Sequence, residues 1–356
     1  MKRIPFSESE LLPNPNPRSF LKMFNPPITP AENLRMAVRG EIPYWIPGSE
    51  TISFNPNIVP DNICRVFVHE TEVPEQKGGP DMFGLDWIYV EEVGGSTVKP
   101  GNPILEDAND WKEVIHFPDI EKWDWAGCAA RNKEYLGDGS MPVFSTHFTG
   151  MYERLISFMD FAEAAVALID EEQQDAVHEL FDALADLHCR IVDKEVEYFH
   201  IDGITFHDDW GSQMSTFFST NTYREMLVPH IRKVVDHCHE KGIIFEMHSC
   251  GHNDRIAEVY AEMGVDMWRP QPMNDFDMVY RTVDGRYMMG MMLPPPKAGA
   301  TDAEKEAAIR ALLDRYSVPH HNIYLTNRAP DPQFTQFYYR VCREYLNEMA
   351  EKAGEA

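Results

Sequence analysis

The segment TYREMLVPHIRKVVDHCHEKGIIFEMHSCG, residues 222–251, has the pattern of one helix followed by one strand. In its first part, apolar residues recur every three or four positions, which predicts an amphipathic helix. Thr222 and Glu225 have the spacing of a capping box at the start of this helix, and Gly242 stands at its end. The apolar run that follows has the length of a buried strand. The segment therefore predicts a strand of a parallel sheet together with its covering helix.

The same alternation of strand and helix runs from Met141 almost to the end of the chain. Amphipathic helical stretches separate six short apolar runs, which are MPVFST, IDGITF, GIIFEMHS, GVDMWRP, RYMMGMM and NIYLT. Thr301 and Glu304 form a second capping-box pair. This alternation predicts an α/β protein with a TIM (β/α)8 barrel, whose two remaining strands lie upstream. An open doubly wound sheet is the alternative, although no glycine-rich phosphate loop follows any of the runs.

Proline is frequent in residues 1–60, where only one helix is convincing, at about Ala31 to Arg39. We interpret this part as an arm that wraps the barrel. Alternating residues around Gly94-Gly95 predict a hairpin. We therefore expect residues 1–135 to form an N-terminal proline-rich arm and a small β-hairpin region packed on the barrel. Residues 136–356 then form the main part of the catalytic barrel, and both parts belong to one structural domain.

Composition argues against several classes of function. A net charge of −26 disfavours nucleic acid and anionic membrane surfaces as partners. The sequence has no run of 18 apolar residues and no apolar segment of a secretory signal at its start. We therefore expect a cytoplasmic protein without a membrane span. None of the six cysteines has CxxC spacing, which argues against a disulfide framework.

Three polar side chains interrupt the apolar run near the end of the segment: Glu246, His248 and Cys250. Side chains of a strand alternate between its two faces, so these three residues share one face. A carboxylate, an imidazole and a thiolate are ligand types that zinc accepts. The spacing thus indicates a metal site. Three buried polar groups with separate hydrogen bonds are the alternative.

Polar groups also follow other strands, at the ends where barrel enzymes place their chemistry. In HDDWGSQ, residues 207–213, strand alternation puts His207 and Asp209 on one face and Asp208 on the other. Such aspartates serve as general acid or base, as metal ligands or as substrate clamps. A structural role, as a helix cap or a support for the next loop, is the alternative for Asp208.

Four residues at these strand ends are candidates for a substrate pocket: His147, Trp210, Gln213 and Met292. Methionine and aromatic side chains suit a flat apolar ligand. Ordinary core packing is the alternative for the methionines and the aromatic rings.

Residues 207–251 resemble the uroporphyrinogen decarboxylase superfamily, and within it the corrinoid-dependent methyltransferases of the O-demethylase type. The shared features are D-D-x-G after one strand, the helix start YREMLVPH, and H-x-C-G at the end of the next strand. ENLRMAVRGEIPYWIP is similar to the N-terminal motif of the superfamily. The resemblance spans about residues 30 to 340 and implies a TIM barrel.

The sequence departs from the pattern of the superfamily in two places. The Arg-rich RQAGR motif, which holds propionate groups in true decarboxylases, has no counterpart here. Zinc thiol-methyltransferases of the superfamily add a late cysteine to H-x-C, and the corresponding stretch YLTNRAPD has none. The resemblance then implies zinc on His248 and Cys250, with Glu246 completing the site. His207 or Asp209 supplies a fourth ligand or protonates the ether oxygen.

The function implied is transfer of a methyl group from a methoxylated, aromatic donor to the cob(I)alamin of a separate corrinoid protein. The cobalamin belongs to that partner, because the cobalt-ligating motif D-x-H-x-x-G is absent from this chain. Two alternatives stay open: methyl transfer from a methyl-corrinoid protein to a thiol or tetrahydrofolate, and a decarboxylase-like lyase. A homodimer also stays open.

Overall fold

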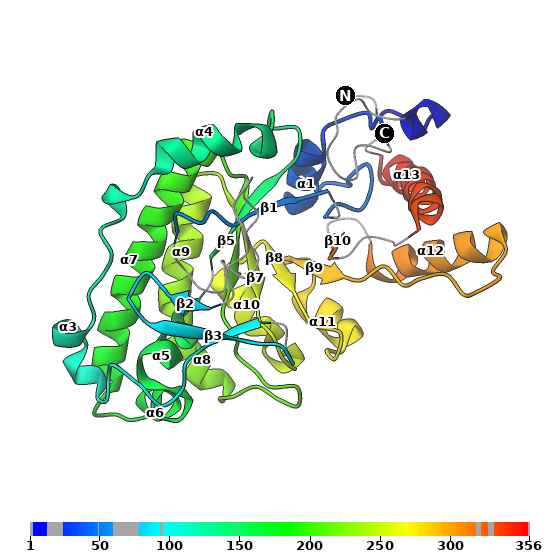
Figure 1. Ribbon diagram of the computed structural model, residues 1–356. Coiled ribbons are helices and arrows are strands. Elements are labelled where there is room, and N and C mark those ends of the chain that lie inside the picture. The colour runs from blue at the N-terminus through cyan, green and yellow to red at the C-terminus, as the bar shows by residue number, and fades with distance from the viewer. Residues whose placement is uncertain are drawn as a thin grey trace.

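The protein is described by a computed structural model over residues 3–12, 24–48, 50–59, 78–92, 95–147, 149–317, 322–326 and 331–354. At its centre lies a curled sheet of seven parallel strands in the order β1-β5-β6-β7-β8-β9-β10 (Figure 1). These strands are β1 (Ile52–Phe54), β5 (Val143–His147), β6 (Gly203–His207), β7 (Ile244–His248), β8 (Met267–Arg269), β9 (Met288–Met291) and β10 (Ile323–Leu325).

Helices connect the strands and cover the outside of the curl, where α7 and α9 lie side by side (Figure 1). The α-helices are α1 (Pro30–Val38), α3 (Trp111–Val114), α4 (Trp125–Leu136), α5 (Met151–Met159), α6 (Phe161–Ala167), α7 (Gln174–Phe199), α8 (Thr220–Met226), α9 (Val228–Glu240), α10 (Ala257–Met263), α11 (Phe276–Val283), α12 (Asp302–Tyr316) and α13 (Pro332–Ala353). Short 3-10 turns are η1 (Glu8–Leu11), η3 (Ala108–Asp110), η4 (Ile120–Lys122) and η5 (Asp254–Ile256).

The predicted α/β class and the parallel sheet agree with this architecture, and the sheet curls as in a TIM-like barrel. Seven strands, rather than eight, form the sheet within the described ranges. One of them, β1, lies upstream of Met141, where the remaining strands were expected, within the residues interpreted as an arm, and it pairs with β5. The N–H of Leu325 in β10 donates to the carbonyl of Pro47 (2.8 Å), so the chain entering β1 touches the opposite edge of the sheet.

The inside of the curl is filled at the N-terminal ends of the strands. Alternate strand residues and one face of α1 form a buried apolar cluster, which consists of Leu34, Ala37, Phe144, Ile244, Met267, Met288 and Tyr324. The amide of Asn322 fixes α1 there by donating to the carbonyls of Ala37 and Glu41. Because this end is closed by α1, the polar side chains of the strands gather toward the other end.

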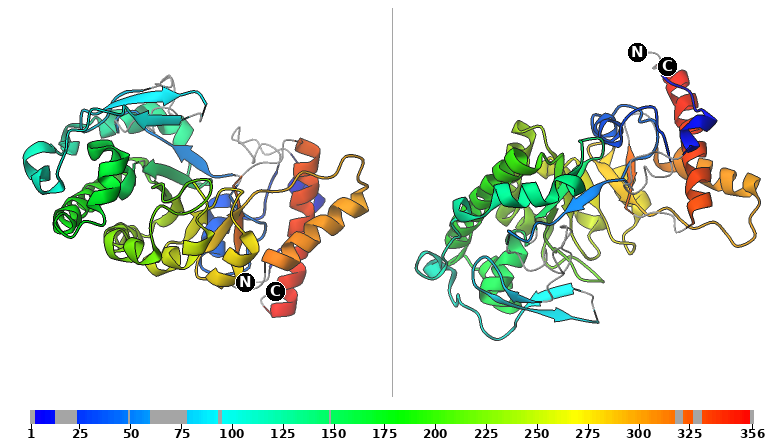
Figure 2. Two further views of the ribbon diagram at one scale, coloured as in Figure 1. Left: turned by 90° about the horizontal axis from the view of Figure 1, so that it is seen from below. Right: turned by 45° about the horizontal axis from the view of Figure 1, so that its top comes forward.

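A second, antiparallel sheet consists of β2 (Gly79–Pro80), β3 (Asp86–Val90) and β4 (Gly95–Val98). Val90 pairs with Gly95, as the predicted hairpin requires, while Gly94 lies outside the described residues. The buried ion pair between Asp81 and Arg154 of α5 (2.5 Å) fastens this sheet to the barrel. Far along the chain, α13 packs beside η1 (Figure 2), where Arg343 binds Glu10 (2.8 Å).

Two helix starts were predicted from capping boxes, and one of them is wrong. Thr301 and Glu304 do form a reciprocal capping box at α12. In the segment quoted first, Ser219 is the N-cap, and the helix is divided at Leu227 into α8 and α9. Pro229 explains the division, because a proline lacks the N–H that would continue the helical hydrogen bonds. Gly242 ends α9 with φ of +73°, as predicted.

Two predictions from composition can be compared with the structure. Among the described helices, none is long and apolar enough to cross a membrane. The five cysteines in the described ranges are all free, in agreement with the expected lack of disulfides. Cys64 lies outside these ranges.

The Asp81–Arg154 pair generates a stability prediction. Arg154→Met leaves the Asp81 carboxylate buried without its countercharge, so we expect the free energy of unfolding to fall by about 3–5 kcal/mol. Urea denaturation followed by circular dichroism measures this loss. Arg224→Met is the control, because it breaks the exposed pair with Glu262 and should cost about 0–1 kcal/mol. Equal losses of unfolding free energy in the two variants would show that the Asp81–Arg154 pair is not the stabilising contact.

Candidate metal centre

The site is built on three neighbouring strands whose residues are in register. His207 in β6 pairs with His248 in β7, and His248 pairs with Arg269 in β8. All three stand at the last position of their strands, at the C-terminal end of the sheet. Strand alternation then directs Asp209 and Cys250, two residues further along, to the same side as the two histidines.

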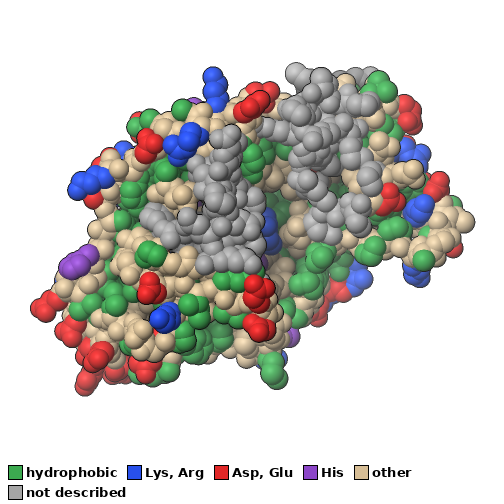
Figure 3. Space-filling model, viewed as in Figure 1, with side chains coloured by type: hydrophobic (Ala, Val, Ile, Leu, Met, Phe, Trp, Pro, Cys, Tyr) green, Lys and Arg blue, Asp and Glu red, His purple; other side chains and the backbone are tan. Residues whose placement is uncertain are grey.

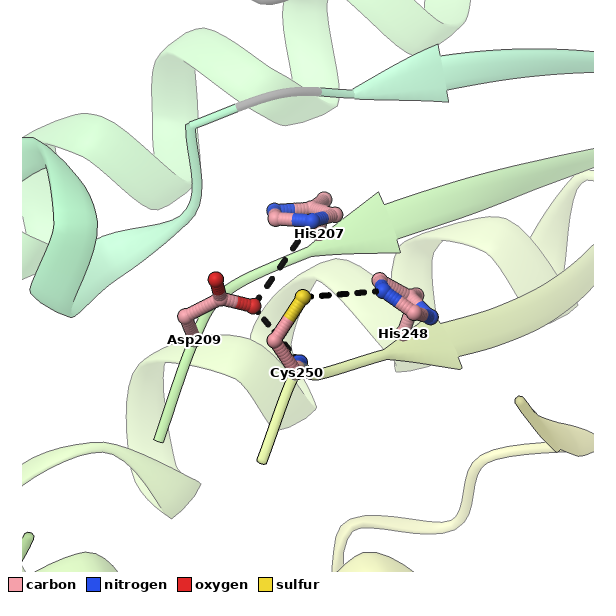
Figure 4. A group of neighbouring side chains, drawn as sticks. All are labelled: His207, Asp209, His248 and Cys250. Carbon is pink, nitrogen blue, oxygen red and sulfur yellow. Dashed lines mark hydrogen bonds and ion pairs between the residues drawn. The ribbon is translucent and has the colours of Figure 1, made fainter. Parts of the chain in front are cut away.

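Four side chains come together there: His207, Asp209, His248 and Cys250 (Figure 4). Each offers one ligand atom, and these atoms all lie within 4.8 Å of one another. Cys250 Sγ is 3.6 Å from His248 Nε2, and His207 Nε2 is 3.6 Å from Asp209 Oδ1. The Cys250 N–H donates to Asp209 Oδ1 (2.6 Å), which joins the two loops.

Both imidazoles are oriented by hydrogen bonds of their other nitrogen. His207 Nδ1–H donates to Glu153 Oε2 (2.8 Å), and His248 Nδ1–H donates to the carbonyl of Arg269 (3.1 Å). The Nε2 atoms of both rings therefore face the group of four. Carboxylates and carbonyls in these positions are the usual partners of metal-binding histidines, because they fix the tautomer and the ring orientation.

The donor set fits zinc. Ligands bound to zinc at about 2.0–2.3 Å in a tetrahedron lie roughly 3.3–3.8 Å from one another, and the two 3.6 Å separations fall in that range. Two imidazoles, a thiolate and a carboxylate are all accepted by this ion. Burial raises the pKa of the Cys250 thiol, so a bound cation would be needed to hold it as a thiolate near neutral pH.

Protonation of the two histidines differs because their surroundings differ. Burial lowers the pKa of His207, but the carboxylates of Glu153 and Asp209 outweigh burial and raise it well above its ordinary value. Burial and the neighbouring His207 lower the pKa of His248 to about 3. His248 is thus neutral and ready to ligate at neutral pH, whereas His207 must release a proton.

Gly251 holds the loop that carries Cys250. Its φ of +97° lies in the left-handed region, and a Cβ there would come 2.4 Å from the backbone of Gly211. The loops after β6 and β7 can therefore approach closely enough for Asp209 to reach Cys250. This contact gives a physical reason for the glycine in H-x-C-G.

Glu246 was expected to complete the metal site, and the structure places it outside the group of four. It lies one layer deeper, fully buried, and it forms an ion pair with Arg269. Thr205 and Tyr324 also donate to its carboxylate, each over 2.6 Å. Glu246 shares the predicted face with His248, but it lies too far from the end of the strand to join the group of four.

Asp208, predicted as an acid or base, faces away from the four ligands and is fully buried. Its carboxylate accepts hydrogen bonds from the N–H groups of Tyr152 (3.1 Å) and Glu153 (2.9 Å) in the first turn of α5, and from Trp210 Nε1 (2.8 Å). Burial raises its pKa to about 6. The arrangement is that of a helix cap supplied by a different element.

His147, expected in the substrate pocket, points instead toward α7. Its Nε2 is 2.7 Å from Glu195 and its Nδ1 is 3.1 Å from His188, in a buried network that also includes Ser145. Ser145 and His147 share the outer face of β5, because the strand alternates and Phe144 faces inward.

The other three pocket candidates differ in exposure. Trp210 is fully buried and stacks on the rings of Tyr223 and Tyr260. Gln213 lies exposed on the loop after β6, and Met292 follows β9 with half of its surface exposed. Among the four candidates, therefore, Gln213 and Met292 are the ones accessible to a ligand.

Glu153 and Arg269 are the residues at the site that sequence reasoning missed. Glu153 lies 54 positions before His207, on a helix, so strand alternation could not relate the two. Arg269 precedes the proline of the run DMWRP, and its parity with Met267 was the available signal that it faces inward.

The first prediction about the candidate metal centre concerns its ligands. In Co²⁺-loaded protein, Cys250→Ala should abolish the sulfur-to-cobalt charge-transfer band, and His248→Ala should lower metal affinity by at least about a hundredfold. Cys189→Ala is the matched control, since that partly exposed cysteine lies on α7. If Cys250→Ala and His248→Ala both retain one metal per chain, the proposed metal centre is wrong. If Glu246→Gln loses the metal, Glu246 is a ligand as the sequence predicted.

The second prediction concerns Glu153. Glu153→Gln removes the charged acceptor of His207 Nδ1–H, so the affinity for Zn²⁺ should fall by about 10–100-fold. Competition with a chromophoric chelator measures the change. Glu163→Gln, at an exposed position on α6, should leave the affinity unchanged. Similar affinities for Zn²⁺ in the wild type, Glu153→Gln and Glu163→Gln would show that Glu153 does not support the centre.

Comparisons with known proteins agree with this fold. Residues 154–327, slightly less than half of the chain, match the sequence model described as Uroporphyrinogen decarboxylase (URO-D). No curated protein matches the sequence. A methyltransferase from Methanosarcina mazei has a similar structure, with a TM-score of 0.57 and 12% identity over 90% of this chain and 99% of that chain.

Two further solved structures have TM-scores too low to support an argument. They are a mannonate dehydratase from Streptococcus suis (TM-score 0.33, 10% identity, 66% of this chain and 85% of that chain) and an intracellular xylanase from Thermoanaerobacterium saccharolyticum (TM-score 0.32, 8% identity, 57% and 70%). By sequence over residues 154–327 the chain is thus similar to the uroporphyrinogen decarboxylase family, and by fold it is similar to a methyltransferase.

Proposed function

We propose that this protein is a methyltransferase that moves a methyl group from a methoxylated, aromatic donor to the cob(I)alamin of a separate corrinoid protein. The observation that carries the proposal is the group of His207, Asp209, His248 and Cys250 at the C-terminal end of the sheet. The similarity in fold to the Methanosarcina methyltransferase supports the reaction class.

An aryl methyl ether reacts slowly with a nucleophile because phenolate leaves poorly. Zinc held by three of the four residues would keep a fourth position for the ether oxygen and would supply a Lewis acid there. His248 and Cys250 are the better ligands for a permanent bond, since their side chains are fixed by Arg269 and by the Gly251 loop. Asp209 is the more exposed of the acidic groups beside the centre, with 29% of its side chain accessible. It completes the shell or protonates the departing oxygen.

Glu153 and Asp208 act by positioning His207. Asp208 caps the first turn of α5, and Glu153 lies in that turn and binds His207. Burial raises the pKa of Glu153 to about 7, although the adjacent His207 opposes this shift. A cation would bind His207 at Nε2, so the proton released is the one on Nε2, while the Nδ1–H stays hydrogen-bonded to the Glu153 carboxylate and keeps the ring in place.

The direction of transfer is part of the proposal. A late cysteine, which would add a second thiolate for activating a thiol substrate, is absent from the sequence YLTNRAPD. Oxygen and nitrogen donors from His207 and Asp209 stand beside Cys250 instead. A centre with one thiolate is the better Lewis acid toward an ether oxygen, because each thiolate donates charge to the metal.

Spectroscopy of cobalamin tests the proposal. Zinc-loaded protein is mixed with free cob(I)alamin and a panel of methoxylated aromatics, and the conversion to methylcobalamin is followed together with the released phenol. We expect both products in equal amounts, and a loss of about a hundredfold in Cys250→Ala and His248→Ala. Cys189→Ala should match the wild type.

Two outcomes would contradict the proposal. If no ether reacts but methylcobalamin is consumed when a thiol or tetrahydrofolate is added, the transfer runs in the opposite direction. If neither reaction occurs and a carboxylated substrate loses CO₂, the protein is a lyase on the same fold.

A further inference from the structure

Cys250 lies two residues beyond the end of β7, so the strand no longer fixes the backbone that carries its thiol. Side chains of the surrounding loops hold this backbone instead. The N–H of Cys250 donates to Asp209 Oδ1 (2.6 Å), and the carbonyl of Cys250 accepts a hydrogen bond from Asn253 Nδ2 (2.6 Å). Both polar groups of the Cys250 backbone thus have a side-chain partner, and the place of the thiol depends on these partners.

The loop after β8 binds the next residue, Gly251, through both of its backbone groups. The N–H of Gly251 donates to Gln271 Oε1 (2.8 Å), and its carbonyl accepts a hydrogen bond from Asn274 Nδ2 (3.0 Å). Pro270 and Pro272 stand on either side of Gln271 and restrict the backbone of this loop. The loop after β7 is therefore fastened to a stiff segment of the neighbouring loop.

The buried amide of Asn274 joins the two loops, and it has only one allowed orientation. Its Oδ1 accepts the N–H of Asn253 (2.7 Å). Its Nδ2 donates to the carbonyls of Gly251 (3.0 Å) and Gln271 (2.9 Å). An amide turned by half a rotation would place its oxygen against these two carbonyls, which offer no donor. A buried polar group with all of its hydrogen bonds formed makes its surroundings rigid.

Asn253 extends this network to Cys250 and is itself kept in place by Gly211. Asn253 is fully buried, and its Nδ2 donates to Ser249 Oγ (2.9 Å) as well as to the carbonyl of Cys250. Its Oδ1 lies 2.4 Å from the point that a Cβ of residue 211 would occupy. The glycine of D-D-x-G therefore leaves the space that the Asn253 amide needs. An alanine there would push the amide away from Cys250.

Electrostatic attraction alone does not explain how the centre would bind one ion tightly. The net charge of the chain is −26, and acidic side chains are spread over the face in Figure 3. Such a surface attracts cations of any kind. Tight binding of one ion depends on ligand atoms in a fixed geometry, and a loop that is ordered only on binding reduces the affinity.

We propose that Asn253, Gln271 and Asn274, here called the amide clamp, are positioning residues that hold the Cys250 loop in its metal-binding conformation before a cation arrives. The amide clamp acts through the backbone of Cys250 and Gly251. The inference rests on the proposed function only through the candidate metal centre, since neither cobalamin nor a methyl donor takes part in it.

Metal binding by Asn274→Asp tests the inference. The variant keeps the shape of the side chain, but an oxygen replaces the two donors and faces the carbonyls of Gly251 and Gln271. We expect the affinity for Co²⁺ to fall by about 10–100-fold, because the loop must then be ordered on binding. The sulfur-to-cobalt charge-transfer band should weaken as well. Competition with a chromophoric chelator and absorption spectroscopy measure these changes.

Asn322→Asp is the matched control. Asn322 is also buried, and its amide also donates to two carbonyls, those of Ala37 (2.8 Å) and Glu41 (3.0 Å). It lies beside α1 at the opposite end of the sheet from the metal centre. Both variants should lose thermal stability to a similar extent, because each leaves two buried carbonyls without donors. Only Asn274→Asp should lose affinity for Co²⁺.

Hydrogen exchange in metal-free protein tests whether the loop is ordered in advance. In the wild type, we expect the amides of residues 249–254 to be protected equally with and without Co²⁺. In metal-free Asn274→Asp, exchange of this segment should be at least about tenfold faster, because the loop opens locally. Gly211→Ala, which displaces the Asn253 amide without removing a hydrogen-bonding group, should act in the same direction.

Two results would overturn the inference. One is equal affinity for Co²⁺ in Asn274→Asp and Asn322→Asp. The other is wild-type exchange of residues 249–254 that slows by more than about tenfold when Co²⁺ binds, since the cation itself would then order the loop. If Asn274→Asp does not fold, Gly211→Ala and Gln271→Met replace it in both measurements. If metal binding depends on the amide clamp but no methyl transfer occurs, the proposed function fails while the positioning role stands.

Discussion

The carboxylate of Glu246 imposes the strictest requirement on this fold, because a charge at the centre of a curled sheet is costly unless it is fully paired. Thr205, Arg269 and Tyr324 meet this requirement, and they come from three other strands. Each of these strands must therefore keep its register relative to β7. A slip of one residue would turn these partners to the outer face and leave the carboxylate alone.

The position of the candidate metal centre depends on this register. His248 stands two positions after Glu246 on the same face, and His207 stands two positions after Thr205. The deep layer of Glu246 and its partners thus fixes the height at which the two imidazoles lie. Cys250 and Asp209 follow at the next inward positions, where the strands have ended and the loops approach through Gly251.

The opposite faces of the same strands connect the centre to the outer shell of the protein. Asp208 caps α5, which brings Glu153 to His207, and the next residue, Arg154, binds Asp81 of the small sheet region. One helix therefore contacts His207 of the candidate metal centre, the buried aspartate behind it and the antiparallel sheet. A change in any of these contacts would shift the imidazole that Glu153 orients.

Strand alternation and spacing could predict much of this arrangement from the sequence. They identified the α/β class, the parallel strands from Met141 onward, and the shared face of His248 and Cys250, as well as that of His207 and Asp209. These inferences depend on local periodicity, which one stretch of sequence contains in full. The domain division at residue 135 stays a prediction, although β1 joins the main sheet from the upstream side.

Only the tertiary structure decided which polar residues meet. Glu246, His248 and Cys250 look equivalent in the sequence, but depth along the strand separates the Arg269-bound carboxylate from the ligands. His147 has the same position at a strand end as His207 and faces α7 instead, because its parity relative to the core is opposite. Glu153 reaches His207 across 54 positions through a helix cap. The sequence by itself determined which faces carry polar groups, and the packing of strands and helices determined their partners, since partners are set by distances in space rather than along the chain.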